Sequence, residues 1–267
     1  MTTLKVLSNL NGRRALITGA AGALGRVFAE TLAELGADLV LVDLPNTDLD
    51  DLSTYIAGKW KVKVEQIECD LEMQDQRTLL ISNLNSSGKD LSILVNNAAL
   101  VGSSSLEGWS VPFENQSIDT WRRAIEINLT AVFDLCQGLS PIMSSSENAS
   151  IVNIASIYGL HAPDWSLYEG TALGNPAAYG VSKGGLIQLT RWLSTTLAPK
   201  VRVNVIAPGG IFRNQPEEFV QRYARKTPLN RMATENDFRG SIAFLASDLS
   251  KYVTGQVLSV DGGWGVL

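Results

Sequence analysis

One stretch near the start of the chain constrains its fold more than any other. A short apolar segment, Arg14–Ile17, runs into a glycine-rich turn, TGAAGALG at Thr18–Gly25. The residues Ala23–Gly36 then carry apolar side chains at helical spacing, and a second apolar segment, Asp38–Val42, ends at Asp43. This order predicts a strand, a turn, a helix and a second strand within about 30 residues, which is the repeating unit of a parallel α/β sheet.

The turn and Asp43 together indicate a dinucleotide site. Glycines at such a turn let the backbone approach a pyrophosphate, which lies at the positive end of the following helix. A glycine-rich turn alone is often only a tight turn, but an acid about 20 residues further along favours a nucleotide ligand. The carboxylate of Asp43 would accept the two hydroxyls of an adenosine ribose and repel a 2′-phosphate. We therefore expect NAD, and not NADP, as the cofactor.

The rest of the chain continues the alternation of strands and helices. We expect further strands at Val64–Cys69, Leu91–Val95, Ser150–Ala155, Val201–Ala207 and Gln256–Val260, and helices at Leu49–Trp60, Gln74–Ser86, Ile118–Leu139, 177–198 and Glu235–Ala246. In a parallel sheet the strand ends all lie at one edge, where ligands bind. Asp43, Asp70 and Asn97 each follow a strand and should therefore converge on one crevice.

Composition excludes several classes of protein. The chain has 267 residues, of which 45% are hydrophobic and 18% charged, as expected for one α/β domain covering residues 1–267. Its net charge of −5 indicates no basic surface for nucleic acid. It contains neither a run of 18 apolar residues nor the apolar core of a signal peptide, so we expect a cytoplasmic protein with no membrane partner.

The sequence does not indicate a metal site or a disulfide. Cys69 and Cys136 stand in apolar surroundings and lack the spacing of a metal or redox motif, so two buried free thiols are expected. The single histidine, His161, cannot form a metal cluster by itself. We therefore expect no metal cofactor.

Tyr179 and Lys183 form a candidate acid/base pair. They lie four residues apart in a segment of helical character, so both side chains should share one helix face. A cation beside a phenol favours the phenolate and lowers the tyrosine pKa below its usual value of about 10, as a general acid/base near neutral pH requires. Taken alone, such a pair is more often a half-buried aromatic residue beside a solvated charge.

Three long connections, at about 100–116, 157–175 and 211–234, are the candidate substrate loops. The first two carry aromatic residues that can lie against a sugar ring, namely Trp109, Phe113, Trp165 and Tyr168, and hydrogen-bonding groups, namely Glu107, Asn115, His161, Asp164 and Glu169. The third is polar, looks mobile and adds Arg213 and Arg222, whose charge suits a carboxylate or phosphate. These features favour a carbohydrate-like small-molecule substrate over a steroid or an acyl chain. An equally good alternative is that the aromatic residues pack the loops as small satellite cores.

From Leu10 to Gly263 the chain resembles the short-chain dehydrogenase/reductase family, in its single-domain branch. The matching residues are TGAAGALG at 18–25, Asp43, Asp70, NNAA at 96–99, Asn128, Ser156, YGVSK at 179–183, Pro208-Gly209 and Asp261-Gly262-Gly263. The resemblance implies an α/β fold, with a Rossmann-type doubly wound seven-stranded parallel sheet in a three-layer α/β/α arrangement. The stretches SIYGLHAPDW and PGGIFRNQPE are also similar to dehydrogenases of surface-polysaccharide and flagellin-glycan pathways, and less closely to gluconate-type sugar dehydrogenases.

The resemblance implies a role for each matching residue. Tyr179 exchanges a proton with the substrate oxygen, Lys183 lowers the pKa of Tyr179 and binds the nicotinamide ribose, and Ser156 stabilises the charge on that oxygen. Asn128 shapes its helix and holds a water that connects the proton to solvent. The implied cofactor residues are Gly19, Ala21, Gly22, Leu24, Gly25, Asp43, Asp70, Leu71, Asn97, Ala98, Ala99, Tyr179, Lys183, Pro208, Gly209 and Ile211. The substrate candidates are Ser156, His161, Trp165 and Arg213.

Some positions depart from the family pattern. The family turn usually reads TGxxxGxG, but here Ala23 takes the place of the middle glycine and Gly22 comes one residue earlier. That spacing is similar to the extended branch of nucleotide-sugar epimerases and dehydratases, whereas the short chain and its ending favour the single-domain branch. Ala99 stands where glycine usually follows NNA. Arg213 stands where a threonine often contacts the nicotinamide carboxamide, so the arginine is free to meet an anionic substrate group.

Two function classes and two assemblies follow from these features. The first class is an NAD(H)-dependent oxidoreductase that interconverts a secondary alcohol and a ketone, with an epimerase or dehydratase as its variant. The second is a catalytically idle, regulatory NAD-binding protein on the same fold, although such a protein has no need of the full set of four catalytic residues. The helices at 118–139 and 177–198 carry more apolar residues than one buried face requires, including Trp192 and Leu193, so we expect a homodimer or homotetramer.

Overall fold

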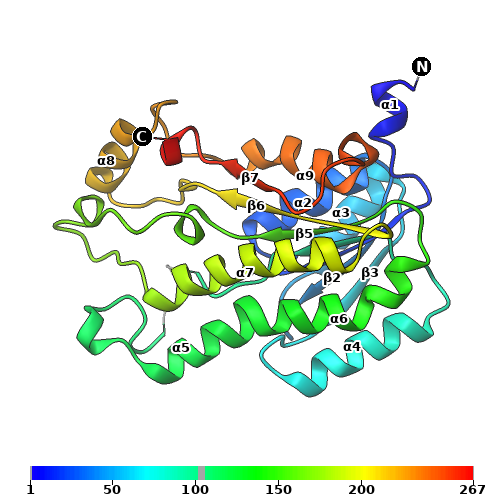
Figure 1. Cartoon of the computed structure of the whole chain (residues 1–267), viewed down its shortest axis with the longest axis horizontal. Helices are drawn as coiled ribbons and strands as arrows, with labels where there is room; N and C mark the ends of the chain where they lie inside the picture. Colours follow the sequence, from blue (N-terminus) through cyan, green and yellow to red (C-terminus); the bar gives the residue numbers. More distant parts are fainter. Residues whose placement is uncertain (1, 102–105, 267) are drawn as a thin grey trace.

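The computed structural model describes residues 2–101 and 106–266, which are built around one seven-stranded sheet (Figure 1). The strands are β1 (Arg14–Thr18), β2 (Asp38–Asp43), β3 (Val64–Glu68), β4 (Ile93–Asn96), β5 (Ala149–Ile154), β6 (Val201–Pro208) and β7 (Val257–Val260). Every neighbouring pair is parallel, and the order across the sheet is β3-β2-β1-β4-β5-β6-β7. The predicted doubly wound sheet is therefore confirmed.

The burial of the strands follows from their place in the sheet. β1, β4 and β5 are buried at every position because helices cover both faces of the sheet, and their sequences are accordingly mostly apolar. The edge strand β3 has no fully buried residue, and three of its five side chains, Glu65, Gln66 and Glu68, are polar. The chain order reverses between β1 and β4, which pair through Ala15 and Ile93. In doubly wound sheets a crevice opens at such a switch point.

Helices pack on both faces of the sheet, as Figure 1 shows. On one face lie α2 (Ala23–Glu34), α3 (Asp50–Trp60) and α9 (Arg239–Ala246), and on the other α4 (Gln74–Ser86), α5 (Ile118–Ile125), α6 (Ala131–Ser144) and α7 (Ala177–Thr196). The two hydrophobic cores are separate. Phe28, Leu32 and Ile242 belong to the first, and Leu80, Leu135 and Leu186 to the second. The three-layer arrangement is thus also confirmed.

The helix predicted at 118–139 is interrupted by a π-helical segment. α5 ends at Ile125, the π-helix Glu126–Thr130 follows, and α6 continues from Ala131. A π-helical segment adds a residue to the turn and so shifts the apolar face around the helix axis. After this shift Phe133 is 41% exposed, while Leu135 and Leu139 are buried.

The polar stretch expected to be mobile between Phe212 and Thr234 contains a regular helix, α8 (Glu217–Lys226). α8 buries Phe219 and Tyr223, which lie four residues apart on one face. The high proportion of charged residues in the stretch hid this short apolar face. Short helices outside the main layers are α1 (Leu4–Leu7), η1 (Phe113–Asn115), η3 (Ile157–Gly159), η4 (Trp165–Leu167), η5 (Glu235–Phe238), η6 (Asp248–Ser250) and η7 (Trp264–Val266).

Candidate active site

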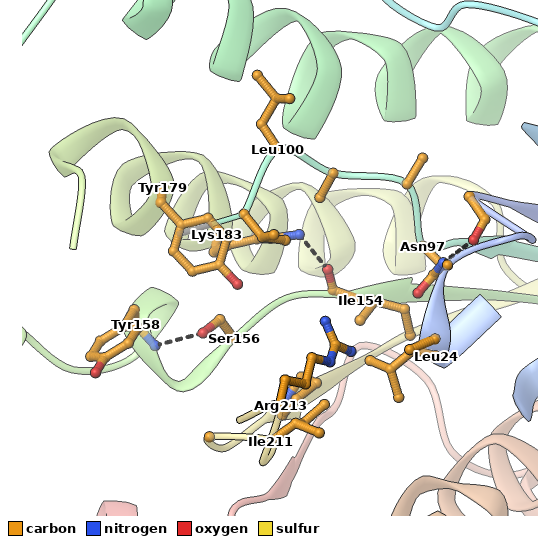
Figure 2. A pocket seen from close by; sticks show the side chains of 18 of the residues that line it. Leu24, Asn97, Leu100, Ile154, Ser156, Tyr158, Tyr179, Lys183, Ile211 and Arg213 are labelled. Atoms are coloured by element: carbon orange, nitrogen blue, oxygen red, sulfur yellow. Dashed lines mark hydrogen bonds between the residues drawn. The ribbon is translucent and has the colours of Figure 1, made fainter. Parts of the chain in front are cut away.

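A cleft with a volume of about 670 Å³ lies at the carboxyl ends of the strands. Its walls come from the turn after β1, from the residues that follow β2, β4, β5 and β6, and from α7. Asp43, Asp70 and Asn97 all line it, so the expected convergence of strand ends is confirmed. Figure 2 shows part of this cleft, with Tyr179, Ser156 and Arg213 arranged around one space.

The glycine-rich turn packs tightly against the end of β4. Gly19 has φ +63°, and a Cβ added there would lie 2.8 Å from the Cα of Ala98. A Cβ on Gly25 would lie 2.1 Å from the carbonyl oxygen of Gly19. Gly22 begins α2 without a side-chain cap. Only glycine therefore fits at positions 19 and 25, and the first backbone N–H groups of α2 remain available to an anion in the cleft.

Most of the residues predicted to bind cofactor line the cleft, but Ala21 and Gly25 do not. The backbone N–H of Ala21 donates to the Asp43 carboxylate over 2.7 Å, and Gly25 packs on the turn. Asn97 lines the cleft, yet its Nδ2 donates to the carbonyls of Thr18 and Gly19, both over 3.0 Å. These three residues therefore support the turn.

The carboxylate of Asp43 is held by two backbone N–H groups, those of Ala21 and, over 2.8 Å, Leu44. Each carboxylate oxygen has a second acceptor site, which remains for a ligand. Within the part of the chain that the structure describes, no Lys or Arg forms a salt bridge with Asp43. Arg26, beside the turn, donates to the carbonyls of Ala21 and Asp48. Among the described residues, the negative charge of the Asp43 carboxylate is therefore not balanced by a salt bridge at this end of the cleft.

Tyr179 and Lys183 share one face of α7 as predicted, and Ser156 follows β5 on the neighbouring wall of the cleft (Figure 2). Lys183 is 3% exposed, and its Nζ donates to the carbonyl of Ile154 over 2.8 Å. The same nitrogen lies 5.8 Å from the centre of the Tyr179 ring. Desolvation lowers the pKa of Lys183 to about 7.

The expected effect of Lys183 on the pKa of Tyr179 stays a prediction, because in this structure the shift of the Tyr179 pKa comes from other groups. Burial raises the pKa of Tyr179, and the groups that oppose this rise are the Ser156 hydroxyl and, at longer range, the Arg213 guanidinium. The Nζ of Lys183 donates to the Ile154 carbonyl, and burial disfavours the charged form of this side chain. A phenolate at Tyr179 therefore needs a further positive charge in the cleft.

Asn128 lies in the π-helical segment and is 1% exposed. Its Oδ1 accepts from the N–H of Leu100, and its Nδ2 donates to the Leu100 carbonyl over 3.1 Å and to Ser182 Oγ over 3.0 Å. The amide is thus bonded to both backbone groups of Leu100 and to one side chain. Leu100 lines the cleft, whereas Asn128 supports it from behind.

Two of the predicted substrate residues lie away from the cleft lining. His161 packs edge-on against Trp264, with ring centres 5.9 Å apart. Trp165 is 58% exposed and packs beside Tyr168, which does line the cleft. Ile157 and Leu167 fill the core of the 157–175 connection, so these two rings pack outside the cleft lining.

The other aromatic candidates also differ from the expectation. Trp109 is 1% exposed, and its Nε1 donates to the carbonyl of Val101, so it packs a satellite core and cannot stack on a ligand. Phe113 is 81% exposed and lies outside the cleft lining. Residues 102–105 of the same connection lie outside the described residues. For Trp109 the alternative of satellite packing is therefore correct.

The two candidate arginines differ in their positions. Arg222 donates to the backbone carbonyls of Leu167 and Glu169 and so ties α8 to the 157–175 connection. Arg213 lines the cleft, and its Nε donates to Glu235 over 3.1 Å. In Figure 2 its guanidinium reaches the same space as the Tyr179 hydroxyl. Of the two, only Arg213 is placed to meet a ligand.

The sequence prediction missed several residues of the substrate half of the cleft. This wall includes Tyr158, Leu173, Asn175, Gln215, Phe219, Tyr223 and Met232. Tyr223 accepts a hydrogen bond from the N–H of Gly210 over 2.6 Å, and burial raises its pKa to about 12. The spacing of Phe219 and Tyr223 on one helix face was the available signal, since it predicts an amphipathic helix against the cleft.

Two further findings concern other kinds of site. Within residues 2–101 and 106–266, no group of three or more His, Cys, Asp or Glu side chains is placed to hold a metal ion. In the same ranges no helix has the length and apolar character needed to cross a membrane. Both cysteines are free and buried, as predicted.

Comparison with known proteins identifies relatives along almost the whole chain. A family model described as enoyl-(acyl carrier protein) reductase matches residues 19–265. The chain is 32% identical over 262 residues to 3-oxoacyl-(acyl-carrier-protein) reductase of Thermotoga maritima, covering 95% of this chain and 98% of that protein. It is 27% identical over 259 residues to post-translational flagellin modification protein A of Campylobacter coli, covering 96% and 100%.

Solved structures show the same similarity. A short-chain dehydrogenase of Leptospira borgpetersenii with bound NAD⁺ superposes with a TM-score of 0.85 at 30% identity, covering 99% of this chain and 96% of that one. A gluconate 5-dehydrogenase of Burkholderia cenocepacia, in complex with NADP and tartrate, gives 0.87 at 26% identity, covering 99% and 100%. These neighbours hold different nicotinamide cofactors.

Proposed function

Because the chain belongs to the short-chain dehydrogenase/reductase family, we propose that it is an NAD(H)-dependent oxidoreductase that interconverts a secondary alcohol and a ketone. One observation carries the proposal. Tyr179, Lys183 and Ser156 line one end of a cleft whose other end is formed by the glycine-rich turn and Asp43. We also propose that the chain forms one catalytic domain, since a single sheet supplies both ends of the cleft.

The turn fits the phosphates of a dinucleotide on grounds of space and charge. The backbone approaches closely at Gly19, and α2 begins with no side-chain cap at Gly22. An anion there would accept from the first N–H groups of the helix and lie at its positive end. The nicotinamide, when bound, supplies or accepts the hydride.

The residues at the other end of the cleft perform the proton transfer. In reduction Tyr179 donates its proton to the carbonyl oxygen, and in oxidation it takes the alcohol proton. Ser156 donates a hydrogen bond to the same oxygen and stabilises the charge that develops there. Lys183 lies behind Tyr179 and becomes a cation more readily when a polar ligand fills the cleft. The positive charge of an oxidised nicotinamide favours the Tyr179 phenolate.

NAD is the proposed cofactor because of Asp43. Its carboxylate points into the adenosine end of the cleft and has no salt-bridge partner among the described residues. A 2′-phosphate beside a carboxylate suffers like-charge repulsion. The bound NAD⁺ of the Leptospira structure agrees with this choice, while the NADP of the Burkholderia structure shows that close fold similarity does not decide it.

We propose a polar, carbohydrate-like substrate that carries an anionic group. The substrate wall combines the Tyr158, Tyr168 and Asn175 polar groups with the Arg213 guanidinium. An arginine is suited to a carboxylate, which it can bind through two hydrogen bonds. The similarity to a gluconate 5-dehydrogenase supports a sugar acid or its keto form.

A panel assay at the absorbance of NADH tests the proposal. The panel contains gluconate, polyols and nucleotide sugars with NAD⁺, and keto sugars, simple ketones and an acetoacetyl thioester with NADH. We expect NAD(H)-linked turnover with polar substrates and its loss by at least about 100-fold in Tyr179→Phe, since positioned proton transfer contributes that much. The variant should still bind NADH, as fluorescence titration will show.

The same assay separates the alternative functions. An epimerase or dehydratase would consume a nucleotide sugar with no net accumulation of NADH, and a product assay would detect the conversion. An idle NAD-binding protein would bind NADH and turn over nothing in the panel. Turnover of the acetoacetyl thioester alone would contradict the polar-substrate proposal but leave the oxidoreductase chemistry intact.

A further inference from the structure

A pair of tyrosines beyond Ser156 lines the cleft and has no part in the proton transfer proposed above. Tyr158 and Tyr168 come from the 157–175 connection, and their hydroxyl oxygens lie 2.7 Å apart. Asn175, itself buried, donates from Nδ2 to the Tyr168 hydroxyl over 3.4 Å. In Figure 2 the Tyr158 hydroxyl lies at the end of its ring remote from Ser156. The pair is therefore placed to contact a part of the substrate away from the reacting carbon.

The two hydroxyl groups carry two O–H protons, of which only one is donated within the pair. Two phenols carry two protons, and the contact between them takes one. The amide of Asn175 is the donor in its own contact and accepts no phenol proton. Among the residues that the structure describes, neither hydroxyl donates to any other protein group. One phenol proton is thus available to a ligand.

The surroundings keep this donor neutral and in place. The Tyr168 ring packs against Phe219, with ring centres 5.4 Å apart, and Phe219 packs against Tyr223. Burial raises the pKa of Tyr158, and the neighbouring Tyr168 phenol adds to the rise, so Tyr158 stays protonated at neutral pH. Without a ligand, water can accept a hydrogen bond from the free phenol O–H of this pair. A ligand that displaces the water but offers no acceptor leaves the O–H unpaired, at a cost in binding free energy.

We infer that Tyr158 and Tyr168 are specificity-determining residues which donate a hydrogen bond to a second oxygen of the substrate, a hydroxyl or carbonyl remote from the reacting carbon. This inference rests on the proposed oxidoreductase function and specifies its substrate class further. The enzyme then prefers a ketone with a second oxygen over its deoxy analogue, because a site built to pair with an oxygen rejects a ligand that lacks it.

A series of small ketones tests this preference with NADH. The pairs are butan-2-one with 3-hydroxybutan-2-one, butan-2-one with 4-hydroxybutan-2-one, and pentan-2-one with 5-hydroxypentan-2-one, which move the hydroxyl stepwise away from the carbonyl. In the wild type we expect kcat/KM for at least one hydroxyketone to exceed that of its parent about tenfold, the effect of roughly one hydrogen bond. In the double variant Tyr158→Phe, Tyr168→Phe we expect the ratio to fall to within about twofold of one.

Phe219→Leu is the matched control. It changes the packing against the Tyr168 ring without removing a hydroxyl, so the hydroxyketone preference should survive even if overall turnover falls. If the double variant does not fold, the two single Phe variants and the wild-type ratios carry the test.

Two results would overturn the inference alone: a wild-type ratio near one for every pair, or a preference that persists in the double variant. In both, the ketones are still turned over. If no ketone in this series or in the earlier panel oxidises NADH, the oxidoreductase proposal fails and this inference fails with it.

Discussion

Lys183 occupies an environment that few lysines tolerate. Its side chain is 3% exposed, and its Nζ has the Ile154 carbonyl as hydrogen-bond acceptor. No carboxylate in the described part of the chain forms a salt bridge with it. Desolvation accordingly lowers its pKa to about 7, well below the 10.5 of a free lysine. The protonation of this one residue is therefore coupled to folding near neutral pH.

We expect this coupling to appear as a pH-dependent stability of the cofactor-free protein. Between pH 7 and pH 10.5 the unfolded chain holds a proton on Lys183 that the folded chain has released. Stability therefore rises with pH in that window, by at most about 1.4 kcal/mol per pH unit for one proton. Urea denaturation at about pH 7.0, 7.75 and 8.5, within the lysine window, will measure the slope of stability against pH. The Lys183→Met substitution should flatten this slope.

The highest of the three measured pH values is chosen to limit ionisation of the two cysteine thiols. Burial raises the pKa of Cys69 to about 11 and of Cys136 to about 12, so above pH 9 the unfolded thiols ionise first and stability falls. The difference between wild type and Lys183→Met removes this shared contribution. An unchanged slope in the variant would show that folding does not lower the pKa of Lys183.

Asp43 is the residue on which cofactor choice should depend. Asp43→Ser removes the repulsion toward a 2′-phosphate, which is worth about 1–3 kcal/mol, so the preference for NADH over NADPH should fall roughly ten- to a hundred-fold. Fluorescence titration with both reduced cofactors will measure the ratio. Asp48→Ser is the control, since it removes an exposed carboxylate outside the cleft lining and should leave the ratio nearly unchanged. Equal or tighter binding of NADPH by the wild type would refute the NAD proposal.

At the scale of elements, the π-helical segment Glu126–Thr130 links the helical layer to the cleft. Arg77, with its side chain 3% exposed, forms salt bridges with Glu126 over 2.8 Å and with Asp134 over 2.7 Å, so it joins the π-helix to α6. Asn128, between them, bonds both backbone groups of Leu100. The segment thus holds the start of the 100–116 connection against α7.

Asn128→Ala should loosen this link. It leaves the N–H and carbonyl of Leu100 and the Ser182 hydroxyl without their partner, at a cost of about 1–3 kcal/mol in the free energy of unfolding. Turnover should fall too, because Leu100 lines the cleft. Urea denaturation will measure the stability. Asn85→Ala, which removes one exposed hydrogen bond on α4, should change it by less than about 0.5 kcal/mol. Equal effects of the two substitutions would argue against the role given to Asn128.

At the scale of the whole molecule, large apolar side chains are exposed on α5, α6 and α7. Ile118, Phe133, Val181 and Trp192 are between 41% and 60% exposed. The three helices lie side by side on one face of the sheet (Figure 1). An exposed apolar surface that spans three helices is suited to pairing with the same surface of a second copy of the chain. We therefore propose a homodimer or a homotetramer.

Sedimentation velocity at micromolar concentration tests the assembly. The wild type should sediment as a dimer or tetramer, and Trp192→Glu should shift it toward smaller species, because a buried unpaired charge is costly at an interface. Leu4→Glu, which charges an exposed apolar side chain on α1, should leave the assembly unchanged. A monodisperse wild-type monomer would contradict the proposal.

The local sequence determined the sheet and the ends of its strands. Short, mainly apolar segments between helical stretches placed all seven strands to within about two residues, because strands buried on both faces are mostly apolar. The same periodicity placed α2, α4 and α7. The predicted convergence of Asp43, Asp70 and Asn97 needed only the rule that parallel strands end at one edge.

The tertiary structure alone decided which loop side chains face the cleft and what their charges do there. Trp109 is buried, His161 and Trp165 lie outside the cleft lining, and Tyr158 lines the cleft, because each loop must bury its own apolar residues and satisfy its backbone. The pKa of Tyr179 likewise depends on burial and on Arg213, which is 34 residues away in sequence. Local patterns carry periodicity and strand ends, whereas side-chain direction and desolvation arise only when distant segments pack together.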